Sequence, residues 1–269
     1  MRNTLKNAKN IVIKVGTSTI TKEDGSFNLR VIDRLAMVIS DLHTGDRNIA
    51  LVSSGAIGCG VGVLGLPARP TCTKEKQAAA AVGQCALMNV YTKRFADYNQ
   101  KVAQVLLTGD VLDRSIREEN ARNTFQTLFA WNVIPIVNAN DTVSVDELQG
   151  GVLAENDSLS AYVALLTQAD LVIILSDIDG LYDHNPSEDA SAKRIPLVEE
   201  ITPALYQIAG GSGSNRGTGG MLSKLKAADM LLHNGTKMVI ASGRDPEVLY
   251  DIIDGKDIGT LFAGKEDAQ

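Results

Sequence analysis

The chain has few cysteines, few histidines and few aromatic residues, and each shortage argues against a class of protein. It contains 3 cysteines, 3 histidines and 4% aromatic residues among 269. Cys59, Cys72 and Cys85 show no C-x-x-C spacing, so the sequence indicates neither a disulfide framework nor a cysteine-bound metal. Cys59 and Cys85 lie in runs of small apolar residues, which predicts that both are packed in the interior.

A metal-binding histidine pattern, a basic surface and a membrane span are also missing. His43, His184 and His233 lie far apart, without the spacing of metal ligands. The formal net charge is -6, whereas proteins that bind duplex nucleic acid normally present a basic face. The apolar run at residues 11–15 contains Lys14 and is too short for a signal peptide or a membrane helix. We therefore expect a cytoplasmic protein that binds neither nucleic acid nor membranes.

The chain does have a regular alternation of short apolar runs and longer amphipathic segments. The apolar runs are rich in β-branched residues, as strands buried on both faces of a parallel sheet are. We expect strands at residues 11–15, 49–52, 102–107, 133–137, 171–175 and 238–241, and helices at 29–42, 76–98, 116–132, 158–168 and 222–233. This alternation predicts an α/β fold with a mainly parallel central sheet.

Other segments interrupt this alternation without dividing the chain. Residues 141–151 are polar with an alternating Thr-Val-Ser-Val run, and are expected to form a hairpin that leaves the sheet. Residues 185–194 and 210–220 are expected to be surface loops. No repeat and no linker composition is visible, so we expect residues 1–269 to form a single domain.

Two motifs directly follow expected strands, where α/β proteins bind ligands. Lys14 lies inside an apolar strand, where a charge is costly unless its ammonium group reaches a polar site. Gly16 would let the backbone approach a phosphate closely; the alternative is a lysine on an edge strand in water. Ser54 and Gly55 precede a helix whose free N–H groups would favour anions, or the serine is only a helix N-cap.

A third motif, at residues 217–224, leads from a glycine-rich loop into a helix. Such a loop offers backbone N–H groups to a polyphosphate, and a bound phosphate would balance Lys224 in the first turns of the helix. The alternative is a flexible linker. The segment is not a Walker A loop, and no G-x-G-x-x-G follows the first strand, which argues against a Rossmann dehydrogenase.

Three clusters of acidic and amide residues complete the set. They lie at residues 138–141 and 176–180, after strands, and at 155–157, before a helix. Asn156 or Asp157 could be only a helix N-cap, and Asp179 with Gly180 could be only a turn. Beside two lysines and two glycine loops, however, the clusters indicate a phosphate site next to an amino-acid pocket.

In their order and spacing, these segments resemble the amino acid kinase family along nearly the whole chain, and within it the glutamate 5-kinases. The resemblance rests on residues 13–18, 52–57, 77–78, 82–84, 122–123, 127, 135–143, 156–161, 177–182 and 217–224. The runs S-G-A-I-G at 54–58 and N-x-N-D-T-V at 138–143 separate glutamate 5-kinases from other kinases of the family. The resemblance implies a three-layer α/β/α sandwich, here without the C-terminal PUA domain that many members carry.

The resemblance also implies the chemistry. ATP, with Mg²⁺, would phosphorylate the γ-carboxylate of L-glutamate, the first step of proline biosynthesis, without a covalent enzyme intermediate. A carboxylate is already a nucleophile at pH 7, so alignment and charge stabilisation would replace a general base. Mg²⁺ would be held mainly by phosphates and water and not directly by the protein. Proline would be a feedback inhibitor, and the enzyme a homo-oligomer, either a dimer or a tetramer.

Roles for individual residues follow from the same resemblance. Lys14 and Lys224 would approach the transferred phosphoryl group, and Asp157 would hold both lysines. Gly16 and Gly55 would donate N–H groups to the developing negative charge. Glutamate would be bound by Ser54, Asp141 and Asn156, and ATP by Lys14, Ser176, Asp177, Thr218, Gly219, Gly220, Met221, Leu222, Ser223 and Lys224.

The chain departs from the family pattern at two positions beside the glutamate residues. Ala139 replaces an acidic residue, and Glu155 stands where aspartate is common. Two alternatives to this function stay open at this point. One is a kinase for another acidic amino acid, and the other is a non-catalytic regulator that binds ATP or an amino acid on the same fold.

Overall fold

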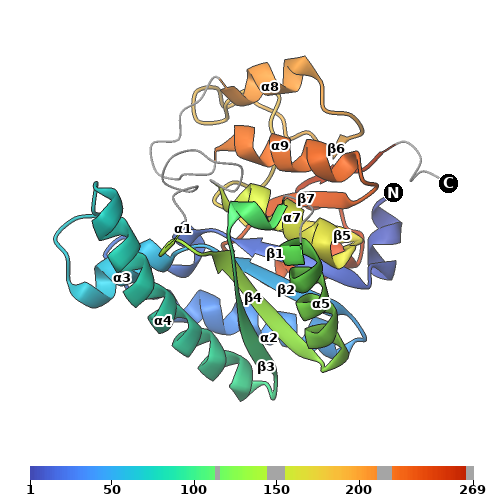
Figure 1. Ribbon diagram of the computed structural model, residues 1–269. Coiled ribbons are helices and arrows are strands. Elements are labelled where there is room, and N and C mark those ends of the chain that lie inside the picture. Colours follow the sequence, from blue (N-terminus) through green and yellow to red (C-terminus); the bar gives the residue numbers. More distant parts are fainter. Residues whose placement is uncertain (113–115, 144–154, 211–219, 265–269) are drawn as a thin grey trace.

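A single eight-stranded sheet forms the centre of the molecule, in the order β3-β4-β2-β1-β5-β7-β8-β6 (Figure 1). The computed structural model describes residues 1–112, 116–143, 155–210 and 220–264. The strands are β1 (Asn10–Val15), β2 (Asn48–Ser53), β3 (Lys101–Leu107), β4 (Val133–Ala139), β5 (Leu171–Ser176), β6 (Leu197–Val198), β7 (Lys237–Ser242) and β8 (Thr260–Phe262). All neighbours pair in parallel except β7 and β8, which confirms the expected mainly parallel sheet.

Helices cover both faces of this sheet, which confirms the three-layer α/β/α architecture (Figure 1). They are α1 (Thr17–Ile20), α2 (Leu29–Thr44), α3 (Ala56–Leu64), α4 (Thr73–Asp97), α5 (Ile116–Ala130), α7 (Asn156–Thr167), α8 (Pro203–Gly210), α9 (Met221–Leu232) and α10 (Val248–Ile253), with 3₁₀ helices η1 (Arg2–Asn7) and η2 (Gly109–Leu112). The six expected strands and five expected helices are all present, with ends displaced by a few residues. The short elements β6, β8, α1, α8 and α10 were not expected, because two to eight residues carry too little periodicity.

Strand β1 separates two hydrophobic clusters, one on each face of the sheet. Ile11, Ile13 and Val15 pack into the cluster that includes α2 and α4. Val12 packs into the opposite cluster, which includes α7 and α9. Because successive side chains of a strand point to opposite faces, Lys14 shares the face of Val12. The alternation in β1 thus directs one charged side chain towards α7.

Helix α3 lies unusually close to α4, because glycines occupy the contact. A Cβ atom added at Gly83 would lie 1.8 Å from the carbonyl oxygen of Ala56, and one at Gly60 would lie 1.9 Å from that of Ala79. Any larger residue at these positions would push the helices apart. This contact fixes the N-terminus of α3 beside the carboxyl end of β2.

The two cysteines expected in the interior differ in their environment. Cys59, in α3, is fully buried, and this burial raises the pKa of its thiol to about 12. Cys85, in contrast, is exposed, so the prediction of interior packing is wrong for this residue. The small apolar residues next to Cys85 in the sequence do not show which side of the long helix α4 faces outward.

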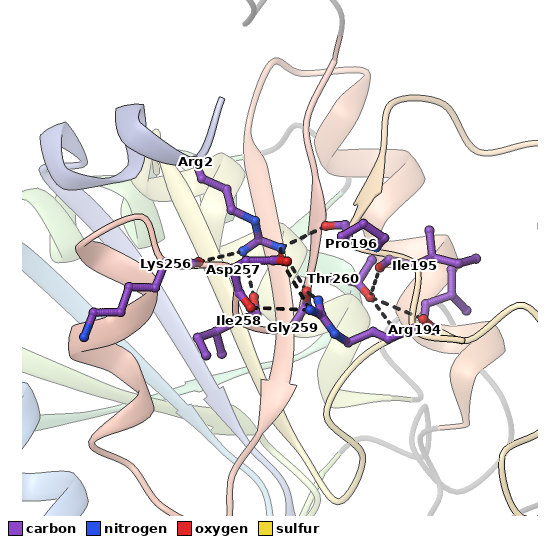
Figure 2. Close-up of polar contacts among 10 residues, drawn as sticks. Arg2, Arg194, Ile195, Pro196, Lys256, Asp257, Ile258, Gly259 and Thr260 are labelled. Carbon is purple, nitrogen blue, oxygen red and sulfur yellow. Dashed lines mark hydrogen bonds and ion pairs between the residues drawn. The ribbon is translucent and has the colours of Figure 1, made fainter. Parts of the chain in front are cut away.

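An arginine cluster closes the sheet on the side of β6 and β8 (Figure 2). The Arg2 guanidinium donates hydrogen bonds to the carbonyl oxygens of Pro196, Lys256, Ile258 and Gly259. Asp257 forms ion pairs with Arg2 at 3.1 Å and with Arg194 at 3.4 Å. These contacts hold η1 against the segments that precede the two short strands.

Of the remaining expectations, the surface loop at 185–194 is confirmed, since it has turns and one isolated bridge residue, Arg194, without a helix or strand. Gly210 ends α8 and Gly220 precedes α9, but the loop between them lies outside the described residues, as does most of the expected hairpin at 141–151. Among the helices described, none is both long and apolar enough to cross a membrane.

Candidate active site

The central strands of the sheet end together and bring the sequence motifs to one edge. Val15, the last residue of β1, is in register with Ser53 of β2 and Leu175 of β5. At or just after these three strand ends lie the residues singled out above, Gly16, Ser54 and Ser176. In the sheet, β2 lies beside β1 on one side and β5, which comes later in the chain, lies beside it on the other. Such a reversal of strand order opens a crevice at the carboxyl ends of the strands.

A buried cluster of one carboxylate and two lysines lies at this crevice. Lys14 Nζ is 2.7 Å from Asp157 Oδ1, and Lys224 Nζ is 3.1 Å from Asp157 Oδ2. Asp157 is 0% exposed, Lys14 7% and Lys224 4%. Burial alone would raise the pKa of Asp157, but the charges of Lys14 and Lys224 outweigh it and lower that pKa from 3.8 to about 2. With two ammonium groups and one carboxylate, the cluster keeps an excess positive charge that suits an anionic ligand.

Asp157 pairs with the two lysines and does not cap helix α7. The N-cap of α7 is Glu155, so the interpretation of Asn156 or Asp157 as the cap is wrong. Ser223, in α9, donates a 2.6 Å hydrogen bond to Asp157 Oδ2. Lys224 lies in the first turn of α9, where a cation opposes the helix dipole, and Asp157 supplies the anion that compensates it. The alternative of an edge lysine in water is likewise wrong for Lys14, which is buried in a central strand.

A polar pocket lies on the β2 and β4 side of this cluster. It is lined by Thr17, Gly55, Ala56, Ile57, Gly58, Arg69, Asn138, Asp141 and Asn156. Asp141 and Asn156 were predicted to bind glutamate, and both line the pocket. Ser54 does not line it, but accepts a 2.6 Å hydrogen bond from Asn156 Nδ2.

A chain of amide side chains fixes the polarity of this pocket. The backbone N–H of Ala139 donates to Asn138 Oδ1 at 2.9 Å, so Asn138 Nδ2 is left to donate to Gln84 Oε1 at 3.0 Å. Asn138 Oδ1 also lies 3.4 Å from Asn156 Nδ2, which is therefore the donor on that side. Asn156 Oδ1 remains as an acceptor, and among the described residues no donor to it is recorded. Together with the Asp141 carboxylate, it can receive an ammonium group.

A larger cavity of about 250 Å³ opens on the β5 side. It is lined by Ser176, Asp177, Ile178, Gly180, Leu181, Tyr182, His184, Asn185, Pro186, Ser187, Ile208, Ala209, Gly220, Met221 and Lys224. Leu181 is fixed from behind, because its N–H donates a 2.8 Å hydrogen bond to the buried hydroxyl of Thr260. Apolar walls with a few polar groups and a lysine at one end suit a flat base attached to phosphates.

A model of the amino acid kinase family matches residues 9–242. The chain belongs to this family. The match includes both lysines, Asp157 and the two pockets, and it rules out the Rossmann dehydrogenase. Two of the most similar curated relatives are glutamate 5-kinases. The protein from Clostridium perfringens is 53% identical over 267 residues, with 99% of each chain covered. The protein from Listeria monocytogenes is 52% identical over 268 residues, which cover 99% of this chain and 97% of the relative.

Solved structures of more distant proteins share the fold. An isopentenyl phosphate kinase from T. acidophilum, solved as a product complex, has a TM-score of 0.65 and 16% identity, with 94% of this chain and 100% of that chain covered. A UMP kinase from Bacillus anthracis has a TM-score of 0.61 and 16% identity, with 96% and 97% covered. At this identity the likeness establishes the amino acid kinase fold alone.

In this amino acid kinase, only some of the residues expected to bind the nucleotide line the larger cavity. Ser176, Asp177, Gly220, Met221 and Lys224 line the larger cavity. Ser223 and Leu222 do not: the first is bonded to Asp157, and the second is 40% exposed. Thr218 and Gly219 lie outside the described residues.

The two glycines expected beside the phosphoryl group, Gly16 and Gly55, differ in their backbone conformation. Gly55 has φ of 106°, a left-handed conformation that other residues adopt only under strain. Gly16 has φ of -83°, which any residue can adopt. A Cβ atom at Gly16 would lie 3.9 Å from Lys14 Nζ, an ordinary van der Waals contact, so position 16 lies directly beside the ammonium group.

Several residues of the site were missed from the sequence. Arg69, in the connection between α3 and α4, belongs to no motif, and nothing in its spacing indicates a ligand. Gln84 was part of the family resemblance, but the sequence did not reveal its contact with Asn138. Pro186 lines the larger cavity, although it lies in the segment 185–194 that was expected to be a surface loop. Tyr182, which also lines this cavity, was part of the family resemblance but had no role assigned to it.

Proposed function

We propose that this chain is a glutamate 5-kinase, which transfers the γ-phosphoryl group of ATP to the γ-carboxylate of L-glutamate. The observation that carries the proposal is the ion-pair cluster of Lys14, Asp157 and Lys224, which lies between a polar pocket and a larger cavity. The identity of 53% to a glutamate 5-kinase over nearly the whole chain supports the same substrate.

In the proposed reaction, a γ-carboxylate oxygen of glutamate attacks the γ-phosphorus of ATP. The new P–O bond forms as the bond from the γ-phosphorus to the β,γ-bridging oxygen breaks, and ADP leaves with that electron pair. No proton has to be removed, because the carboxylate is ionised at pH 7. Lys14 and Lys224 stabilise the charge on the transferred group, while Asp157 holds the two ammonium groups in fixed positions. N–H groups at Gly16 and Gly55 are further donors to the same group.

Glutamate would occupy the polar pocket with its γ-carboxylate towards the lysines, and the pocket, with a free volume of about 10 Å³, would widen to admit it. Its α-ammonium group would lie between the Asp141 carboxylate and Asn156 Oδ1, two acceptors of residues that line the pocket. Because the backbone N–H of Ala139 sets the direction of the amide chain, the acceptor at Asn156 is available before the substrate arrives. Such preorganisation reduces the cost of binding.

ATP would occupy the larger cavity, and Mg²⁺ would enter with it as MgATP. Among the described residues, no group of three or more His, Cys, Asp or Glu side chains could hold a metal ion. Asp157, the carboxylate at the centre of the site, is already engaged by both lysines. The proposal therefore assigns the coordination of Mg²⁺ to phosphate oxygens and water, which this ion readily retains.

The test is an acyl phosphate assay over a panel of acidic and neutral amino acids. The purified protein is incubated with MgATP and each amino acid, hydroxylamine traps the acyl phosphate, and hydroxamate and ADP are measured together. We expect equal amounts of both products with L-glutamate and much less with aspartate or N-acetylglutamate. Binding of ATP and glutamate without hydroxamate would identify a non-catalytic regulator, and turnover of another acid in preference to glutamate would refute the proposed substrate.

A further inference from the structure

One cationic side chain lines the described part of the pocket proposed for glutamate, and the mechanism above does not use it. Among the nine described residues that line this pocket, Arg69 is the only cation and Asp141 the only anion. Lys14 is not among these residues, and Lys224 lines the other cavity. The arginine is therefore a positive charge in this pocket that is distinct from the two lysines of the ion-pair cluster.

Arg69 is exposed, and no hydrogen bond or ion pair to it is recorded within the described part of the chain. A guanidinium group has five N–H donors in a planar arrangement that matches a carboxylate, and it is always charged. Asp141 lines the same pocket, which therefore presents one cationic and one anionic side chain among its described residues. An α-amino acid carries the complementary pair, an α-carboxylate and an α-ammonium group.

The local sequence restrains the backbone on which this side chain is mounted. Pro67 and Pro70 flank Ala68 and Arg69, and the residue before a proline is confined to extended conformations. The segment also joins α3 to α4, whose glycine-mediated contact fixes both helices. The loop that contains Arg69 is therefore restrained by its two prolines and by the helices at both of its ends.

We propose that Arg69 binds the α-carboxylate of the amino-acid substrate and so selects free α-amino acids over analogues without that charge. This inference rests on the function proposed above and adds the group that recognises the third charge of glutamate. The γ-carboxylate faces the lysines, the α-ammonium group faces Asp141 and Asn156, and the α-carboxylate faces Arg69. The arginine contacts a part of the substrate that does not change during the reaction, so it acts on binding and not on the chemical step.

The test compares Arg69→Ala with Lys74→Ala, a matched control. Lys74 is exposed, lies five residues further along and does not line the pocket, so its removal makes the same change in net charge. Each variant is assayed with glutamate and with glutamate α-amide, which keeps the reactive γ-carboxylate but replaces the α-carboxylate by a neutral group. For Arg69→Ala we expect the KM for glutamate to rise roughly tenfold, as a solvent-exposed charged hydrogen bond permits, with kcat and the KM for ATP nearly unchanged.

The preference for glutamate over its α-amide, measured as a ratio of kcat/KM values, decides the proposal. It should fall by about the same factor of ten in Arg69→Ala, recover in part in Arg69→Lys and stay unchanged in Lys74→Ala. An unchanged preference in Arg69→Ala, or an equal fall in Lys74→Ala, would overturn the role of Arg69 while leaving the kinase activity established. If the wild-type protein forms no hydroxamate from glutamate, the proposed function itself is wrong and the role of Arg69 fails with it.

Discussion

Replacement of Asp157 by asparagine tests the centre of the proposed site. The amide keeps the size of the side chain and one acceptor oxygen, but it cannot balance two ammonium groups. The N-cap of α7 is Glu155, so the substitution leaves the helix cap in place and removes only the modest interaction of the Asp157 charge with the helix dipole. We expect the variant to fold and to lose at least a hundredfold in kcat, because both lysines lose the anion that positions them.

The structure also sets the expected loss of stability. The folded protein holds the pKa of Asp157 at about 2 instead of 3.8, which at 1.36 kcal/mol per unit corresponds to on the order of 2 kcal/mol. Because the pKa is depressed, this stabilisation is present at neutral pH and is lost as pH falls from about 4 through 2. The neutral amide of the Asp157→Asn variant would take away the carboxylate that both buried lysines contact, so we expect a loss of roughly 2–4 kcal/mol, or about 5–15 °C in Tm.

The assay measures hydroxamate formation together with thermal unfolding, with Asp170→Asn as a matched control. Asp170 accepts hydrogen bonds from the backbone N–H groups of Lys9 and Asn10, at the opposite end of β1 from the crevice. The control should lose stability but keep kcat within about threefold, since no substrate approaches it. A folded Asp157→Asn protein with kcat within tenfold of the wild type would refute the reasoning, because the lysines would then not depend on the carboxylate. MgATP should raise the Tm of the variant more than that of the wild type, since the phosphates supply the missing negative charge.

Four further predictions concern the two pockets and the packing behind them. Lys224→Ala should lower kcat by about 10²–10³ with a smaller effect on the KM for glutamate, and near-normal kcat would remove this lysine from the mechanism. Asp141→Ala should raise the KM for glutamate about ten- to a hundredfold and leave that for ATP unchanged; equal changes in both would indicate a structural role. Gly83→Ala should lower the Tm by several degrees, because its Cβ would lie 1.8 Å from the carbonyl oxygen of Ala56, and an unchanged Tm would show that α3 can move away. Proline, which shares the α-carboxylate and α-nitrogen of glutamate, should raise the apparent KM for glutamate without lowering kcat; the opposite pattern would indicate a separate site.

The fold could be predicted from the sequence wherever a segment was long enough to show a period. The buried strands β1, β2, β4 and β5 were recognised because both of their faces are covered and their sequences are almost continuously apolar. The antiparallel strand β8 was not recognised, since three residues carry no pattern. The segment before it is held by Arg2, which is more than 250 residues away in the sequence. A contact of that kind has no local signal.

Site residues could be predicted where a charged residue stands at a position that disfavours its charge. A lysine inside an apolar strand and a lysine in the first turn of a helix both oppose local preferences, which indicated a polar or anionic site at each. That Asp157 is their common partner was implied by the family resemblance, and in the structure it contacts both lysines. Arg69 violates no such rule, because an arginine in an exposed loop is ordinary. Its place in the pocket follows from the packing of α3 on α4, which only the structure reveals.

In the proposed reaction, the first turn of α7 would contact both the amino-acid pocket and the phosphate-binding lysines. Neighbouring residues of an α-helix point in directions about 100° apart, so Asn156 and Asp157 face different sides of the helix. Asn156 bonds Ser54 and lines the polar pocket, whereas Asp157 bonds Lys14 and Lys224. The spacing between the amino-acid pocket and the two lysines is therefore set by the geometry of a single buried helical turn. A substitution that shifts this turn should alter the alignment of both substrates together and lower kcat more than it weakens the binding of either one.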